Sequence, residues 1–164
     1  MRIGPRRYGG KLVQLGVVAI AGLMTASAAG LVYPGGNPGH ARAAVENNAL
    51  RLSNRVLDTQ WQVHGTRLQP VLIRNRITDQ TLPLHDCDGF ALILADGTIA
   101  RSADLQILEA PRAVPLAPAN RAARLSERLP GVMITARLGA PEGRYDLDWQ
   151  LILRDGANAA RQQI

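Results

Sequence analysis

Apolar positions divide the chain into one uncharged N-terminal run and a longer region of short alternating segments. Residues 12–33 form a run of 22 residues without a charged side chain. As a helix this run would be about 33 Å long, enough to cross a bilayer core of about 30 Å. Prolines and glycines between residues 34 and 39 would end such a helix. The pattern predicts one transmembrane or signal helix, followed by a Pro/Gly linker over residues 34–48.

Positive charge before the apolar run predicts that the N-terminus stays in the cytoplasm. Residues 1–11 contain three arginines and one lysine and no acidic residue, the bias expected of a cytoplasmic flank. The run is long enough to remain as an uncleaved anchor, and this interpretation is preferred. A buried core helix of a cytoplasmic protein is disfavoured, because the run has no polar face.

Two cleaved alternatives stay open. A secretory signal could be cut at the small residues Ala26-Ser27-Ala28. A longer twin-arginine leader would use Arg6-Arg7 and a cut at Ala41-Arg42-Ala43, although Gly9-Gly10 stands where that pattern usually has a bulky pair. Whether residues 1–44 are retained in the mature protein distinguishes the anchor from both.

Period-2 alternation predicts β-strands in the region after the linker. Residues 145–153 alternate most regularly, with Tyr145, Leu147, Trp149, Leu151 and Leu153 on one face. Residues 132–138 alternate in the same way, beginning with Val132 on the apolar face. Residues 68–77 predict a further strand with Val71, Ile73, Asn75 and Ile77 on one face.

Shorter patterns complete the predicted set of strands. Residues 61–65 predict a strand that ends in a turn, and residues 90–94 predict one that runs into Asp96-Gly97, a strong hairpin signal. Residues 98–101 form the returning strand of that hairpin. Residues 45–60 fit either a short helix or a first strand.

Between the hairpin and the last two strands, two segments are less regular. Residues 109–120 contain three prolines and predict an exposed connection of polyproline II character. Residues 121–129 favour alternation again. About seven short strands with frequent turns predict a mostly β fold, an immunoglobulin-like β-sandwich over residues 49–155. Residues 156–164 are polar and predict a flexible tail.

Part of this region resembles a known class of domain. Residues 68–102 are similar to the middle of small bacterial exported immunoglobulin-like domains, and the matching residues are Val71, Ile73, Asn75, Phe90, Leu92, Asp96 and Gly97. Residues 61–77 also look like membrane-anchored sandwich domains that follow a zinc ribbon and one helix in some proteobacterial proteins, although this chain has no zinc ribbon. The resemblance implies a fold, and it implies no chemistry.

Charge and cysteine content narrow the function classes. Of the formal net charge of +6, five charges lie in residues 1–44, whereas residues 45–164 hold 14 basic and 13 acidic residues. The predicted domain is therefore nearly neutral and has no basic stripe for nucleic acid. Cys87 is the only cysteine, which excludes an internal disulfide, a Cys-x-x-Cys site and an antibody-type domain.

One cluster combines side chains that bind metals. His85, Asp86, Cys87 and Asp88 are consecutive, and copper or zinc would accept such ligands. Consecutive residues of an extended chain point to opposite faces, so at most two can converge. A third ligand would have to be His64 or His40. The preferred interpretation is a polar turn with a small cysteine, without a metal ion or other cofactor, and neighbouring acids disfavour Cys87 as a nucleophile.

No other pattern indicates catalysis. Asp146 and Asp148 share a face of the last strand and are more typical of a solvated surface than of a glycosidase pair. Trp61 and Trp149 could stack on a sugar, but their positions on apolar faces favour a core role. Phosphate-binding glycine loops and metalloprotease or serine-hydrolase motifs do not occur.

These observations favour a non-enzymatic protein of the cell envelope. We expect a single-pass bacterial inner-membrane protein whose domain lies in the periplasm or outside the cell and binds another envelope protein, through an edge strand or through loops. The alternative is a cleaved, secreted, soluble binder of a small ligand or metal. An enzyme is the least favoured class.

Overall fold

The computed structural model describes residues 36–164, and the predicted membrane or signal helix at residues 12–33 lies outside these residues. The described part is mostly β, as predicted, and its strands form antiparallel sheets. Among these residues no helix has the length and apolar character needed to cross a bilayer.

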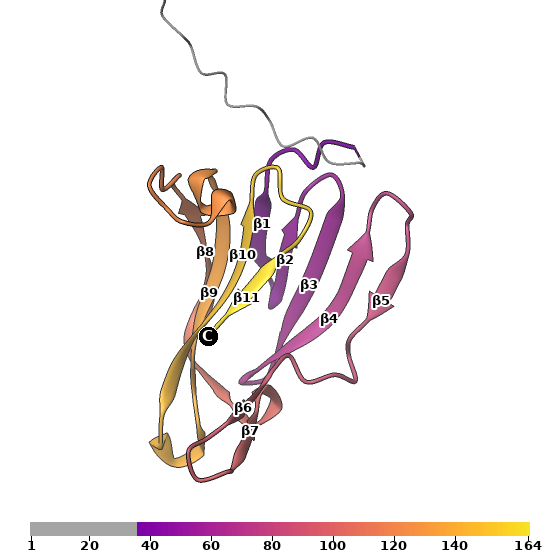
Figure 1. The fold of residues 1–164 in the computed structure, drawn as a ribbon. Coiled ribbons are helices and arrows are strands. Elements are labelled where there is room, and N and C mark those ends of the chain that lie inside the picture. Colours follow the sequence, from indigo (N-terminus) through magenta and orange to yellow (C-terminus); the bar gives the residue numbers. More distant parts are fainter. Residues whose placement is uncertain (1–35) are drawn as a thin grey trace, which may run out of the picture. The chain divides into compact units, whose positions relative to one another are not determined.

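Two sheets and one hairpin contain the strands of the described region (Figure 1). Sheet 1 has the order β1 (Arg42–Glu46), β2 (Ala49–Ser53), β3 (Leu57–His64), β4 (Arg67–Asn75) and β5 (Thr81–Pro83). Sheet 2 has the order β11 (Arg161–Gln163), β10 (Asp146–Arg154), β9 (Gly131–Gly139) and β8 (Gln106–Leu116). The hairpin pairs β6 (Ala91–Ile93) with β7 (Ile99–Arg101).

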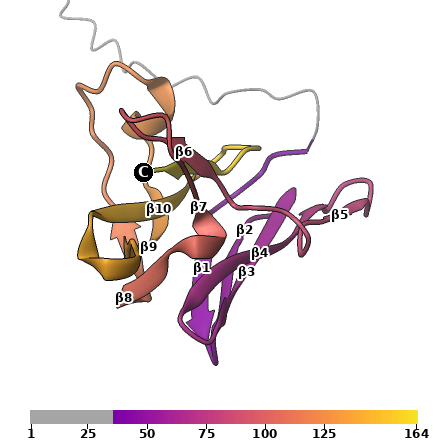
Figure 2. The same cartoon turned by 90° about the horizontal axis from the view of Figure 1, so that it is seen from below.

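The core lies between the inner faces of the two sheets, which form separate layers in Figure 2. Sheet 1 contributes Leu50, Leu52, Trp61 and Leu68, and sheet 2 contributes Ile134, Ala136, Leu138, Trp149, Leu151 and Leu153. Two residues outside the strands complete this set: Leu105, which follows the short 3₁₀ helix η1 (Ser102–Asp104), and Ala140, which follows β9. Each sheet is apolar on one face, so alternate residues of its strands are buried against the other sheet.

The most regular patterns are confirmed. Trp149 and Leu153 of β10 are fully buried, while Asp146 and Asp148 on the other face are exposed. In β9, Ile134 is buried and Arg137 of the opposite face is exposed. Asp96-Gly97 turns the chain between β6 and β7, with the Gly97 N–H donating to the Leu94 carbonyl oxygen at 2.9 Å.

The predicted linker over residues 34–48 ends too late, because β1 begins at Arg42. Ala43 and Val45 of β1 pack against the core, but small residues at alternate positions give a weak sequence signal. The segment 45–60, left open between helix and strand, belongs to β1, β2 and the start of β3.

The exposed proline-rich connection predicted at residues 109–120 is wrong over most of its length. Strand β8 runs through Pro111 and Pro115. Its place at the edge of sheet 2 allows this, because an edge strand can point proline, which has no N–H, away from its single neighbour. Two irregularities in its register with β9 fall between Ile107 and Arg112.

Two further predictions need correction. Residues 121–129 form turns and the 3₁₀ helix η2 (Leu125–Arg128), whose Leu125 is exposed, in place of the expected strand. The tail predicted as flexible from residue 156 contains β11, which pairs with β10. Backbone hydrogen bonds make this pairing, so the polar side chains of β11 carried no signal for it.

Strand β4 changes face in its middle. Trp61 pairs with Pro70 and Gln60 with Leu72, so Val71 is an extra residue on β4. This bulge shifts the alternation by one residue, so the buried Leu68 shares the inner face with Ile73. Strict alternation would have placed Leu68 on the face opposite to Ile73.

Candidate functional site

The His85–Asp88 cluster forms a polar turn after β5. His85 Nε2 lies 3.1 Å from a carboxylate oxygen of Asp86, whereas Asp88 lies 2.6 Å from the Arg101 guanidinium. The Cys87 N–H donates to the Leu84 carbonyl oxygen at 2.9 Å, and its side chain is exposed. The two carboxylates therefore have separate partners.

The two other histidines do not join this turn. His40 Nδ1 lies 2.6 Å from Asp155 near the start of β1, and His64 is exposed at the end of β3. Within residues 36–164, no three His, Cys, Asp or Glu side chains are placed to share a metal ion.

The remaining candidates for chemistry are the pair Asp146 and Asp148 and the two tryptophans. Asp146 pairs with Arg137 at 3.1 Å, and Arg137 also lies 3.7 Å from Glu109. Asp146 and Asp148 therefore belong to an exposed charged face of sheet 2, as the sequence favoured. Trp61 and Trp149 are buried and pack against each other across the core, so neither offers an open platform for a sugar ring.

One groove of about 500 Å³ opens between the sheets, and we call it the inner groove. Sheet 1 extends past sheet 2 here, because β11 has three residues and β5 lies beyond it (Figure 1). Trp61 and Pro70 line its sheet 1 side, and Ala160 and Gln162 line its sheet 2 side, together with Leu57, Thr59, Ile73, Leu84, Cys87, Asp88, Gly89, Leu151, Asn158 and Ala159.

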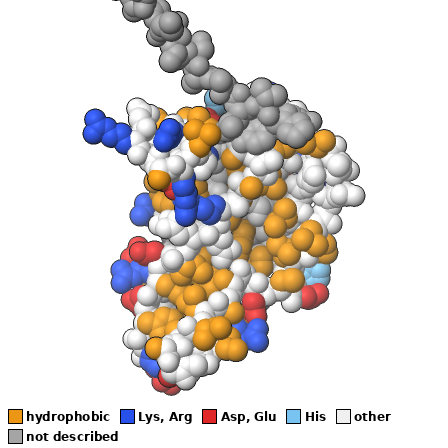
Figure 3. Space-filling view, viewed as in Figure 1, with side chains coloured by type: hydrophobic (Ala, Val, Ile, Leu, Met, Phe, Trp, Pro, Cys, Tyr) orange, Lys and Arg blue, Asp and Glu red, His pale blue; other side chains and the backbone are white. Residues whose placement is uncertain are grey.

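Apolar side chains stay exposed along this groove. Ile73 pairs with both Thr59 and Leu82, so the three side chains share the inner face of sheet 1. Thr59 is 4 % exposed, but Ile73 in the groove is 39 % exposed, and Leu82, which pairs with Ile73 beside the groove, is 59 % exposed. Hydrophobic side chains gather in the same way over the middle of the face in Figure 3. Asp88 is the one charged residue of the lining, and Arg101 pairs with it.

A second hollow of about 660 Å³ lies on the outer side of sheet 1, at the end where β1 begins and β2 ends. We call it the arginine groove. Its lining comprises His40, Arg42, Ala43, Ala44, Arg51, Ser53, Asn54, Arg55 and Arg76. Four of these nine residues are arginines, whereas no residue of the lining is acidic.

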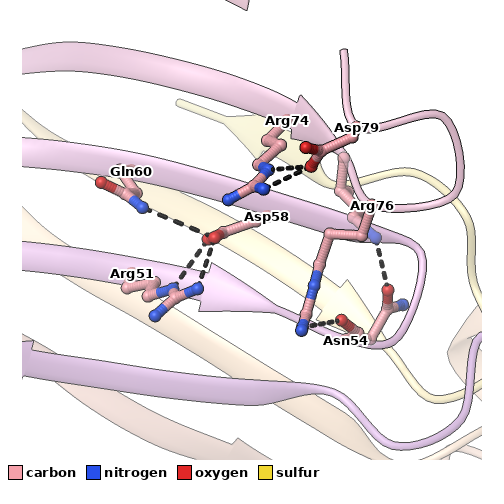
Figure 4. A network of polar contacts seen from close by, with 8 residues as sticks. Arg51, Asn54, Asp58, Gln60, Arg74, Arg76 and Asp79 are labelled. Carbon is pink, nitrogen blue, oxygen red and sulfur yellow. Dashed lines mark hydrogen bonds and ion pairs between the residues drawn. The ribbon is translucent and has the colours of Figure 1, made fainter. Parts of the chain in front are cut away.

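Hydrogen bonds fix part of the arginine groove (Figure 4). Arg51 Nε and Nη2 donate to the two carboxylate oxygens of Asp58 at 2.8 and 2.5 Å, and Gln60 Nε2 lies 3.5 Å from the same carboxylate. The Asp58 carboxylate raises the pKa of Arg51 through this hydrogen bond and through its charge. Arg76 Nη1 donates to the Asn54 carbonyl oxygen at 2.7 Å.

Comparison with known proteins adds no relationship. No protein-family model, no curated protein and no solved structure matches this chain.

Sequence reasoning identified neither groove. The inner groove depends on how far one sheet extends past the other, which no local pattern records. The arginine groove combines residues from positions 40 to 76 that are adjacent only because β1, β2 and β4 bring the same end of sheet 1 together.

Proposed function

We propose that this chain is a non-catalytic protein of the bacterial envelope, held in the inner membrane by residues 12–33. Its β domain would lie in the periplasm or outside the cell and bind another envelope protein. The inner groove carries this proposal, because it leaves Ile73 of β4 uncovered beside the edge of β11. The tether rests on the length and flanking charge of the apolar run.

The occupant that we propose is an extended, uncharged segment of the partner protein. The lining has a single charge, already paired with Arg101, so a charged segment would lose solvation without gaining an opposite charge. The edge of β11 that faces away from β10 has no strand partner among the described residues. A segment that pairs there could place alternate side chains against Ile73 and Leu82, as in strand addition.

We also propose that the two sheets form the two layers of an immunoglobulin-like β-sandwich. Two antiparallel sheets that share one core support this architecture. The strand order departs from that family, because each sheet here consists of consecutive strands, whereas immunoglobulin sheets combine strands distant in the sequence. The proposal therefore extends to the layers and not to the connections.

Cys87 allows a direct test, because the only cysteine of the chain lines the inner groove. A photoreactive maleimide on Cys87 of the full chain in its native membranes should crosslink one partner protein. The crosslink should be lost in Ile73→Lys and Leu84→Lys, since both residues line the groove. It should persist in Ile93→Lys, since Ile93 is 80 % exposed in β6 and does not line the groove. Equal crosslinking in all three variants would contradict partner binding in this groove.

A secreted, soluble binder of a small ligand is the second candidate. The groove volume of about 500 Å³ supports it, because sites for small molecules typically occupy about 300–1,000 Å³. N-terminal sequencing of the mature protein separates the two candidates: the tethered protein keeps residues 1–44, and the secreted one has lost most of them.

A further inference from the structure

We infer that the arginine groove binds a phosphate-bearing ligand, which is a second binding site on the outer side of sheet 1. Arginine suits this ligand, because its planar guanidinium donates paired hydrogen bonds to phosphate oxygens. Three features of the groove support such a site: the charges that remain unpaired in it, the fixed backbone at His40 and its position in the chain.

Most of the positive charge in the groove is unpaired. Asp58 neutralises Arg51 and Asp155 pairs with His40. Among residues 36–164, Arg42, Arg55 and Arg76 have no ion pair. The four arginines and two carboxylates leave a net charge of +2 with His40 neutral, or +3 with His40 protonated.

The rest of the N-terminal chain cannot neutralise this charge. Glu46 is the first acidic residue of the sequence, so the residues that precede β1 have no side-chain carboxylate to offer. An external anion is therefore the natural counter-charge. Three available guanidinium groups favour a phosphate, which has more acceptor oxygens than a single carboxylate.

Backbone contacts of Gly39 and Ala41 fix the chain on both sides of His40, which lines the groove. Gly39 has a φ of +71°, its N–H donates to Asn37 Oδ1 at 2.9 Å, and its carbonyl oxygen accepts from the Gly156 N–H at 2.8 Å. The Ala41 N–H donates to Asp155 at 2.9 Å. A side chain at position 39 would have its Cβ about 3.2 Å from Arg55 Cδ and Nε, so a glycine here leaves room for the Arg55 side chain.

Free phosphate compounds and lipid headgroups share this chemistry. His40 follows Tyr33, the end of the predicted membrane segment, by seven residues, which is at most about 25 Å of extended chain. Anionic headgroups would then be within reach of the groove. Binding of a lipid headgroup rests on the proposed tether, whereas the recognition of phosphate itself does not.

The test uses the full chain in a neutral detergent, titrated separately with inorganic pyrophosphate and with monomeric dihexanoyl phosphatidylglycerol. Calorimetry should show one site, weakened roughly tenfold or more in Arg42→Gln/Arg55→Gln by loss of charge-assisted hydrogen bonds. Neither side chain makes a hydrogen bond within the described part of the chain, so the variant should keep its melting temperature. Arg67→Gln/Arg121→Gln removes the same charge from exposed positions outside the groove and should bind normally.

The two probes separate the sources. Binding of pyrophosphate alone supports a free phosphate compound, and binding of the lipid supports a headgroup. Equal weakening in both double variants would overturn the inference, because net charge would then explain the binding. The inference would also be overturned if neither pyrophosphate nor the lipid bound, even if an acidic peptide bound to the groove. These outcomes are independent of the Cys87 crosslink, so either proposal can fail alone.

Discussion

The indole rings of Trp61 and Trp149 meet across the core with their centroids 4.9 Å apart and their planes at 60°. Trp61 comes from β3 of sheet 1 and Trp149 from β10 of sheet 2. A tilted arrangement places the positive edge of one ring toward the negative face of the other, which adds to the gain from burial. This pair links the two sheets at the centre of the domain.

Truncation of Trp149 should therefore unfold or strongly destabilise the domain. We expect Trp149→Ala to lower the free energy of unfolding by about 3–5 kcal/mol, as large core truncations do. Gln150→Ala should cost almost nothing, because Gln150 points to the other side of β10 and remains partly exposed. Thermal melts of both variants measure this, and a larger loss for Gln150→Ala would contradict the register.

Asp58 is the buried partner in its pair with Arg51, since its side chain is 2 % exposed and that of Arg51 is 51 % exposed. Removing the arginine should therefore be harmful, because it leaves a buried carboxylate without its main donor. We expect Arg51→Ala to cost about 1–3 kcal/mol in denaturant unfolding. Arg51→Ala/Asp58→Asn should recover part of that loss. An unchanged free energy of unfolding in Arg51→Ala would contradict this expectation and would indicate that water replaces the arginine at Asp58.

The β6–β7 turn should respond to acid through Asp96. A hydrogen bond from the Thr98 N–H, at 2.9 Å, lowers the pKa of the Asp96 carboxyl, and a smaller contribution comes from Arg144. A carboxyl whose pKa is lower in the folded state stabilises the fold above its ordinary pKa of about 4. That contribution is lost as the pH falls through the lowered pKa.

The Thr98 amide resonance should report this change in an NMR titration. It should shift as the carboxyl becomes protonated at a pH below that of an ordinary aspartate. Asp96→Asn keeps an acceptor for the Thr98 N–H but removes the titration, so its Thr98 resonance should stay constant. A transition at or above the ordinary pKa in the unmodified chain would contradict the assigned shift.

Cys87→Ser should leave folding and metal content unchanged. Cys87 is exposed, and mild surface substitutions change stability by less than about 1 kcal/mol. Denaturant unfolding and elemental analysis of the purified full chain check both quantities. A stoichiometric metal ion that disappears with this substitution would show that the His85–Asp88 turn binds a metal.

The location of the domain can be tested with reporter fusions. Alkaline phosphatase fused after Ile164 should be active, because that enzyme folds only outside the cytoplasm, where its disulfides form. A reporter that works only in the cytoplasm should be inactive at the same position. The reverse result would exclude both the tethered and the secreted interpretation.

Sequence by itself determined the mostly β class and the clearest strands. Strict alternation in β9 and β10 identified the side chains that face the core, because successive residues of a strand point to opposite faces. It did not predict that Ile152, on the other face of β10, is buried as well. Asp96-Gly97 located one hairpin for a similarly local reason, since glycine accepts the positive φ of +83° found there.

Only the tertiary structure decided the edges of the sheets and both grooves. Strand β11 pairs through its backbone, and β8 accommodates prolines because only one side of it is paired. The bulge at Val71 changes the face of β4 in response to its neighbour β3. Ile73 is left uncovered because sheet 2 ends at β11, and Arg42 meets Arg76 in one groove because β1, β2, β3 and β4 align their ends. Such features depend on contacts between distant segments, for which a local pattern of polar and apolar residues contains no information.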